Sequence, residues 1–179
     1  GFFILTPVFG RREFPAQGKI GLAALVSFIV YPLIPDTNFY SNLWIIISGV
    51  IKEFTVGISM GYATFLIFSS LYLAGEIIDL EMGFGIVNVL DPQSNTQVPL
   101  MGNFYYILTI LLFLTINGHH MLISAIIKSY DLLPLGEMVF EADLLLGMIT
   151  SFNNMFILGI KVALPIVSII FLTDIALGI

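Results

Sequence analysis

Phe54 to Gly75 reads FTVGISMGYATFLIFSSLYLAG, a run of 22 residues without a charged side chain. A helix of about 20 such residues is long enough to cross the hydrocarbon core of a bilayer. The rest of the composition agrees, since 58% of the 179 residues are hydrophobic and only 10% are charged. A water-soluble domain of this length could not bury so much apolar surface in one core. The sequence therefore predicts an integral membrane protein and excludes a soluble enzyme.

Charge and composition also narrow the partners and the chemistry. The formal net charge is −6, which offers no electrostatic attraction to a nucleic acid. The chain contains no cysteine, so disulfides, thiolate metal sites and cysteine nucleophiles are excluded. We therefore predict no nucleic-acid partner, no cofactor, no metal and no catalytic residue. Both ends lie within apolar runs and the first residue is Gly1, so we expect a fragment of a longer protein that lacks both termini.

Prolines, glycines and charges delimit the expected helices. Only two charge-free stretches, 54–75 and 92–127, are long enough to span a bilayer by that criterion alone. The shorter stretches indicate helices that pack on protein neighbours as well as on lipid. Strand alternation and internal repeats are absent from the sequence, so we predict an all-α membrane protein with long kinked helices and helical hairpins. The first expected helix starts at Lys19 and ends at Pro32, and the second stretch runs from Leu43 to Met82 as one helix or a kinked pair. The third runs from Leu100 to Leu133 with a break at Asn117-Gly118. The last starts near Leu144 and bends at Pro165.

A stripe of small residues lies within the longest expected helix. Gly49, Glu53, Gly57 and Gly61 recur every four residues, and the last two form a GxxxG pattern. Such a stripe lets a second backbone approach closely, so it predicts a tight helix–helix interface within the protein or with a partner. Chance is the alternative, because glycine is common in membrane helices.

Carboxylates follow the long apolar run. Glu76 and Asp79 are three residues apart and therefore share a helix face, and Glu81 and Asp91 come soon after. A proton relay or ion pathway is one interpretation, and a helix that simply leaves the membrane is another. We favour a structural role in which carboxylates cap backbone amides or pair with lysines, because a pump would need carboxylates deeper in several spans. The predicted buried polar network comprises Glu53, Glu76 and Asp79.

The stretch NGHH, Asn117 to His120, contains both histidines of the chain. Consecutive helical residues point about 100° apart, so two adjacent histidines are poorly placed to bind one ion. The spacings HxxxH and HExxH do not occur. We predict a helix break with hydrogen-bonding imidazoles rather than a metal site.

The segment from Met82 to Pro99 reads MGFGIVNVLDPQSNTQVP and resists a helix because of its glycines and prolines. About half of its residues are apolar and half are uncharged polar residues, and Asp91 is its only charged residue. Irregular backbone at membrane depth is tolerated only inside protein or along a water-filled cavity. The segment, called here the 82–99 loop, is therefore either a re-entrant-like loop that narrows a pore or an exposed surface loop, and the residues alone leave both open. The pore-plug hypothesis names Met82, Gly83, Phe84, Gly85, Ile86, Val87, Asn88, Asp91 and Pro92.

At this point the sequence resembles a known family, FliR of the flagellar protein export apparatus. The resemblance is most specific in the run AGEIIDLEMGFGIVNVLDPQSNTQVP, Ala74 to Pro99, and in FLTINGHH, Phe113 to His120. It covers almost the whole chain in order. The other similar runs are GFFILTPVFGRREFPAQGKIGLA at 1–23, KEFTVGISMGYA at 52–63, SYDLLPLG at 129–136 and ALPIVSIIFLTDIALG at 163–178.

This resemblance implies a role that composition does not supply. FliR-like proteins join FliP and FliQ in a helical hetero-oligomeric ring, the type III export gate in the bacterial inner membrane at the flagellar basal body, with FlhB nearby. Unfolded flagellar subunits pass through the ring, and the loop corresponding to 82–99 helps to plug it. The resemblance thus implies one helical export-gate domain over 1–179, in contact with membrane lipid, that is not an enzyme. The alternatives are a carboxylate-relay ion transporter and the equivalent subunit of a virulence injectisome.

Overall fold

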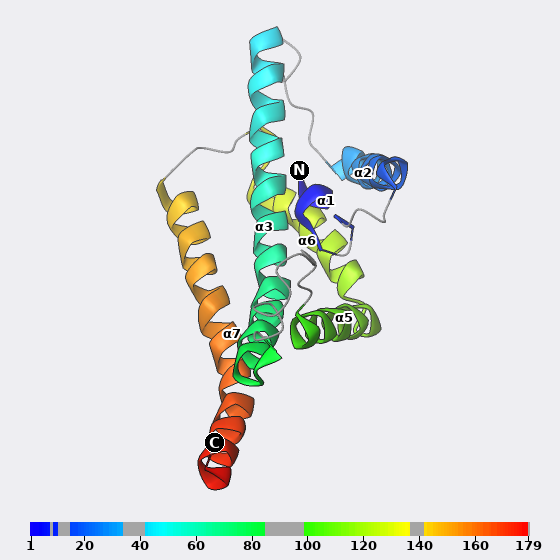
Figure 1. Ribbon diagram of the computed structural model, residues 1–179. Coiled ribbons are helices and arrows are strands. Elements are labelled where there is room, and N and C mark those ends of the chain that lie inside the picture. The colour runs from blue at the N-terminus through cyan, green and yellow to red at the C-terminus, as the bar shows by residue number, and fades with distance from the viewer. Residues whose placement is uncertain (8, 11–14, 34–41, 85–98, 137–141, 179) are drawn as a thin grey trace, which may run out of the picture. The chain divides into compact units, whose positions relative to one another are not determined.

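The computed structural model describes residues 1–7, 9–10, 15–33, 42–84, 99–136 and 142–178, and all regular structure in these ranges is helical (Figure 1). The all-α prediction is therefore confirmed for the described residues. The helices are α1 (Phe2–Leu5), α2 (Ala16–Val30), the short 3-10 helix η1 (Tyr31–Leu33), α3 (Leu43–Glu81), α5 (Leu100–Thr115), α6 (Gly118–Leu132) and α7 (Ala142–Leu177).

Helices α3 and α7 are each long and apolar enough to cross a membrane, by length and composition. The pair α5 and α6 meets the same criterion only when it is counted as one span bent by 70°. We expected only 54–75 and 92–127 to be long enough to span a bilayer, and this was wrong for the last helix. Helix α7 contains Lys161 and Asp174, yet its apolar window is long enough to cross a membrane. A membrane helix tolerates a few ionisable residues, so a strict charge-free criterion is too severe.

Helix boundaries follow the local sequence. Helix α2 begins at Ala16, directly after Pro15, and therefore three residues before the expected start. It ends before Pro32, as expected, because proline cannot continue the backbone hydrogen bonding. The predicted break between α5 and α6 is confirmed, since Asn117 adopts a left-handed conformation with φ of 57°. Asparagine is one of the few residues that tolerate this region.

Pro165 lies inside α7, which is assigned as one helix from Ala142 to Leu177. The stretch expected to be one helix or a kinked pair from Leu43 to Met82 is assigned as one helix, Leu43–Glu81. Prolines are tolerated in membrane helices because neighbouring groups satisfy the freed carbonyl.

Contacts group the chain into two units, and each is described by itself. The first unit contains Gly1–Phe65 and Phe113–Met148, and the second contains Leu66–Leu112 and Ile149–Ile179. The prediction of one domain over 1–179 stays a prediction. The core of the second unit is formed by Ala74, Ile78 and Ala163, with partly buried side chains around them.

Candidate functional site

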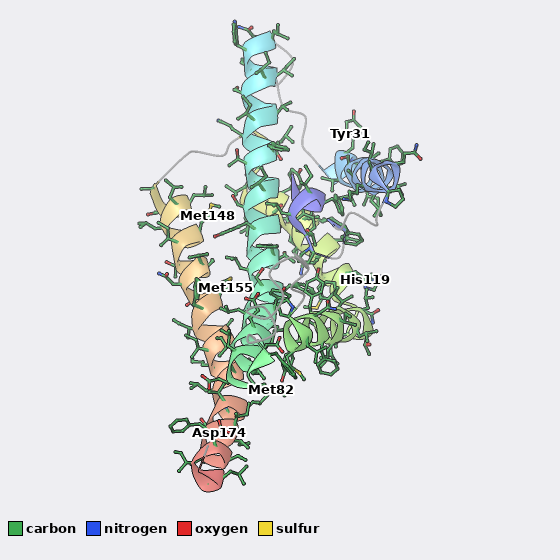
Figure 2. All side chains as sticks on the ribbon, in the orientation of Figure 1. Tyr31, Met82, His119, Met148, Met155 and Asp174 are labelled. Carbon is green, nitrogen blue, oxygen red and sulfur yellow. The ribbon has the colours of Figure 1, made fainter. Side chains whose placement is uncertain are left out.

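The C-terminal end of α3 opens the 82–99 loop. The amide of Met82 donates to the carbonyl of Ile78 at 2.9 Å, and that of Gly83 donates to Leu80 at 3.1 Å. Gly83 has a φ of 78°, a left-handed conformation that glycine adopts without steric cost and that commonly ends helices. Figure 2 shows Met82 at this end of α3. Glycine at this position therefore fixes where the helix stops.

Three of the predicted plug residues are described by the structure. Met82 and Phe84 are 43% and 42% exposed, so their apolar side chains are available for contact outside the chain. Gly83 lies between them in the turn. The other predicted plug residues, Gly85, Ile86, Val87, Asn88, Asp91 and Pro92, lie outside the described residues.

The loop ends where α5 begins, and there a carboxylate of α3 meets the first turn of α5. Asp79 accepts hydrogen bonds from the amide of Met101, at 3.1 Å to Oδ1 and 2.9 Å to Oδ2. Its Oδ2 also accepts from the amide of Gly102 at 3.3 Å. Asp79 is only 6% exposed. The donors are thus backbone amides at a helix N-terminus, where the partial positive charge of the helix favours an anion.

Two glycines bring the helix backbones together at the same place. An added Cβ on Gly75 would overlap the backbone nitrogen and Cα of Gly102. Gly75 and Asp79 are four residues apart and lie on the same face of α3. One face of α3 therefore receives both the backbone and the amides of the α5 N-terminus, and we call this the α3–α5 joint. The sequence analysis predicted Asp79 but missed Gly75 and Gly102, although a glycine one helical turn before a buried carboxylate was a usable signal.

The contact of α7 with α3 in the second unit also depends on a glycine. An added Cβ on Gly159 would lie 2.9 Å from the carbonyl oxygen of Ser70 and 3.0 Å from Cδ2 of Leu73. The sequence analysis did not single out Gly159. Small residues at helix crossings are a general feature of membrane proteins.

Glu53 and Lys52, adjacent on α3, bind the backbone of one residue, Gly136, in the first unit. The amide of Gly136 donates to Glu53 Oε1 at 3.1 Å, and Lys52 Nζ donates to the carbonyl of Gly136 at 3.0 Å. The hydroxyl of Tyr130 donates to Glu53 Oε2 at 3.2 Å. Gly136 has a φ of 76°, so it too needs to be glycine. The backbone N–H and C=O of Gly136 are thereby both satisfied by charged side chains.

The predicted buried polar network stays a prediction, and its members fall in two units that are described separately. Glu53 belongs to the first unit, whereas Glu76 and Asp79 belong to the second. Glu76 is partly buried on α3. Each of Glu53 and Asp79 accepts backbone hydrogen bonds of its own, as described above.

The glycine stripe of α3 faces the first residues of the chain. An added Cβ on Gly57 would lie 3.0 Å from the nitrogen of Phe2, and one on Gly61 would lie 2.9 Å from its carbonyl oxygen. Helix α1 thus packs directly on the α3 backbone at these two positions. Gly49 is buried, one turn before Glu53.

A cavity of about 420 Å³ lies in the first unit, lined by Glu53 and Tyr130 and otherwise mainly by apolar side chains and backbone, among them Phe2, Val26 and Val30. Its carboxylate is already hydrogen-bonded by Tyr130. The cavity is mainly apolar, and the carboxylate in its lining already has hydrogen-bond partners.

The two histidines follow the break between α5 and α6. Their rings are 4.3 Å apart and nearly perpendicular. Nδ1 of His119 is buried and has no hydrogen-bond partner among the described residues, so the expectation of a hydrogen-bonding imidazole was wrong for this atom. Within the same residues, no three metal-ligating side chains come together.

Helices of this length and hydropathy belong in a bilayer, so the structure defines an all-α membrane protein. The chain belongs to the family of bacterial export proteins, family 1, which it matches over residues 1–179. It is similar to the flagellar biosynthetic protein FliR of Bacillus subtilis, with 34% identity over 99% of this chain, and to FliR of Escherichia coli, with 30% identity over 97%. FliR of Pectobacterium carotovorum is 33% identical over 97% of the chain. The chain spans 70% of the length of the Bacillus protein and 66% of the other two.

Proposed function

We propose that this chain is a subunit of the flagellar type III protein export gate. In this proposal it joins FliP-, FliQ- and FlhB-type proteins in the bacterial inner membrane at the flagellar basal body. Unfolded flagellar proteins pass through the conduit that these subunits form. The observation that carries the proposal is the match of the whole chain to a family of bacterial export proteins, with relatives that are flagellar biosynthetic proteins.

The exposed surfaces of the long helices support assembly with lipid and with other subunits. Only 6% of the apolar window of α3 and 11% of that of α7 is buried within the chain. Large side chains such as Trp44 of α3 and Leu177 of α7 are 75% and 67% exposed. Contiguous apolar surface of this extent marks contact with a membrane or with protein partners.

The 82–99 loop is proposed to narrow the conduit. Its described ends are close in sequence to the α3–α5 joint, since Met82 follows Asp79 by three residues and Pro99 precedes Met101 by two. A narrow apolar throat loses its water and blocks ions without any strong ion pair. An unfolded chain could then displace the segment without separating opposite charges. The mechanism is passive, and this chain contributes no chemical step.

A loop-shortened variant tests this function. Removing residues 83–88 from the full-length protein should raise the leakage of small ions through membranes that contain the assembled gate. Co-purification with FliP and FliQ should stay intact, because the helices that pack are unchanged. Removing the six residues 36–41 is the matched control and should not raise leakage. Unchanged leakage in an assembled 83–88 variant would count against the plug.

The carboxylate-relay transporter remains the competing function, with Glu76, Asp79 and Asp91 as relay groups. The hydrogen bonds of Asp79 to two backbone amides support a structural role for this residue instead. A transporter should carry ions in proteoliposomes that contain this protein alone and should lose that activity in Glu76→Gln. The export-gate proposal expects no such activity from the protein alone.

The equivalent subunit of a virulence injectisome would share this architecture. The relatives named above are flagellar proteins, which supports the flagellar version. Expression of the full-length protein in a strain that lacks its own FliR should restore motility. Restoration of injectisome secretion without motility would reverse the assignment.

A further inference from the structure

We propose that Asp79 is a positioning residue that holds the start of α5 on the end of α3 and thereby fixes where the 82–99 loop returns. The functional consequence rests on the proposed function, because it assumes that the loop narrows the conduit.

The sequence just before α5 offers no local acceptor for the first amides of that helix, which is why Asp79 is needed. The first amides of a helix have no partner within the helix and are normally capped by a nearby polar side chain. Here Pro99 precedes the helix and has no side-chain acceptor. The amide of Asn103 donates to the carbonyl of Pro99 at 2.9 Å, which leaves the amides of Met101 and Gly102 to be satisfied from elsewhere.

Asp79 supplies the missing acceptors from a different helix. It lies 22 residues before Met101 and 23 before Gly102, and it binds both amides. The site is closed to water, since Asp79 is 6% exposed and Gly102 is buried. Solvent therefore cannot readily replace the carboxylate, and a buried amide without a partner is costly.

The same carboxylate is close in sequence to the other end of the loop. Gly83, which ends α3, is four residues after Asp79, and the amide of Met82 binds the carbonyl of Ile78, the residue before Asp79. One residue thus links the point where the chain leaves α3 with the point where it enters α5. Movement of the α5 end away from α3 breaks both hydrogen bonds of Asp79.

Hydrogen exchange tests the positioning role directly. In the full-length protein assembled with its export-gate partners, Asp79→Asn should raise the exchange rate of the amides of Met101 and Gly102 by about tenfold, which corresponds to about 1.4 kcal/mol. Asparagine has nearly the same shape but loses the charge and one acceptor oxygen, so folding should be retained. Asp79→Ala should raise the rate further. Asp174→Asn is the matched control, because this residue lies on α7 toward its C-terminal end and not at the joint (Figure 2).

Ion leakage measured on the same variants separates this inference from the proposed function. We expect Asp79→Asn to leak and Asp174→Asn to behave as the unaltered protein. Unchanged exchange at Met101 and Gly102 would overturn the positioning role. Faster exchange without leakage, while the 83–88 deletion leaks, would overturn the link to the conduit but not the plug. Absence of leakage in both Asp79→Asn and the 83–88 deletion would overturn the proposed plug, and with it the link between Asp79 and the conduit.

Discussion

The α3–α5 joint makes a quantitative prediction for Gly75→Ala. The new Cβ would overlap the backbone of Gly102 and the carbonyl carbon of Met101. Ordinary contact between carbon atoms needs about 3.5 Å or more, so α5 has to retreat by roughly 1 Å. The hydrogen bonds of Asp79, now 2.9 Å and 3.3 Å, would then lengthen beyond useful geometry.

The expected cost has two contributions. Overpacking a tight site costs about 1–3 kcal/mol. Loss of hydrogen bonds to a charged group costs about 1.5–3 kcal/mol. A retreat of α5 relieves the overlap while it lengthens the hydrogen bonds, so the two costs do not add in full and we expect a destabilisation of about 3 kcal/mol. For a chain of this size, that lowers the midpoint of thermal unfolding by roughly 6–12 °C.

The measurement is the thermal midpoint of the detergent-solubilised full-length protein, read as the loss of its monodisperse peak in size-exclusion chromatography after heating. Gly21→Ala in α2 is the control, because an added Cβ there meets no atom within 4 Å. Alanine in an open helix position should stabilise by about 0.5–1 kcal/mol. If Gly75→Ala melts at the same temperature as Gly21→Ala, the close approach of α3 and α5 is not what holds the joint.

Two further predictions concern the first unit. Replacing both Gly57 and Gly61 by leucine should drive α1 off α3, because the new side chains would occupy the place of its backbone. Co-purification with FliP and FliQ should then be lost, and normal complex formation would show that assembly does not depend on this contact. Glu53→Gln should accelerate hydrogen exchange at the amide of Gly136 and destabilise the protein by about 1–3 kcal/mol, since a charge-assisted bond is weakened; an unchanged exchange rate would show that the Glu53 carboxylate does not protect this amide.

Much of the helical organisation could be predicted from simple physical rules. Proline and charge positions gave the long helix from Leu43 to Glu81, the end of α2 and the break at Asn117. These features depend on the local backbone, so they can be recognised without tertiary contacts. The span formed by α7 was missed because Lys161 shortens its charge-free stretch.

The joint could be predicted only in part. Asp79 stands out in sequence because a carboxylate beside a long apolar run is costly. Its partners, Met101 and Gly102, carry no side-chain signal, since they contribute backbone amides across more than twenty residues. The backbone N–H and C=O of Gly136, bound by Glu53 and Lys52, were missed for the same reason. Backbone donors and acceptors occur at almost every residue, so a pattern of residue types cannot select among them.

The carboxylate that caps α5 belongs to Asp79, more than twenty residues earlier in the chain, and this has a consequence for biosynthesis. During translation Asp79 emerges from the ribosome 22 residues ahead of Met101, so it at first has neither of its two final donors. A carboxylate in that state is costly within hydrocarbon and stable in the headgroup region. The end of α3 should therefore stay at the membrane surface during insertion and settle to its final depth only after the first turn of α5 arrives.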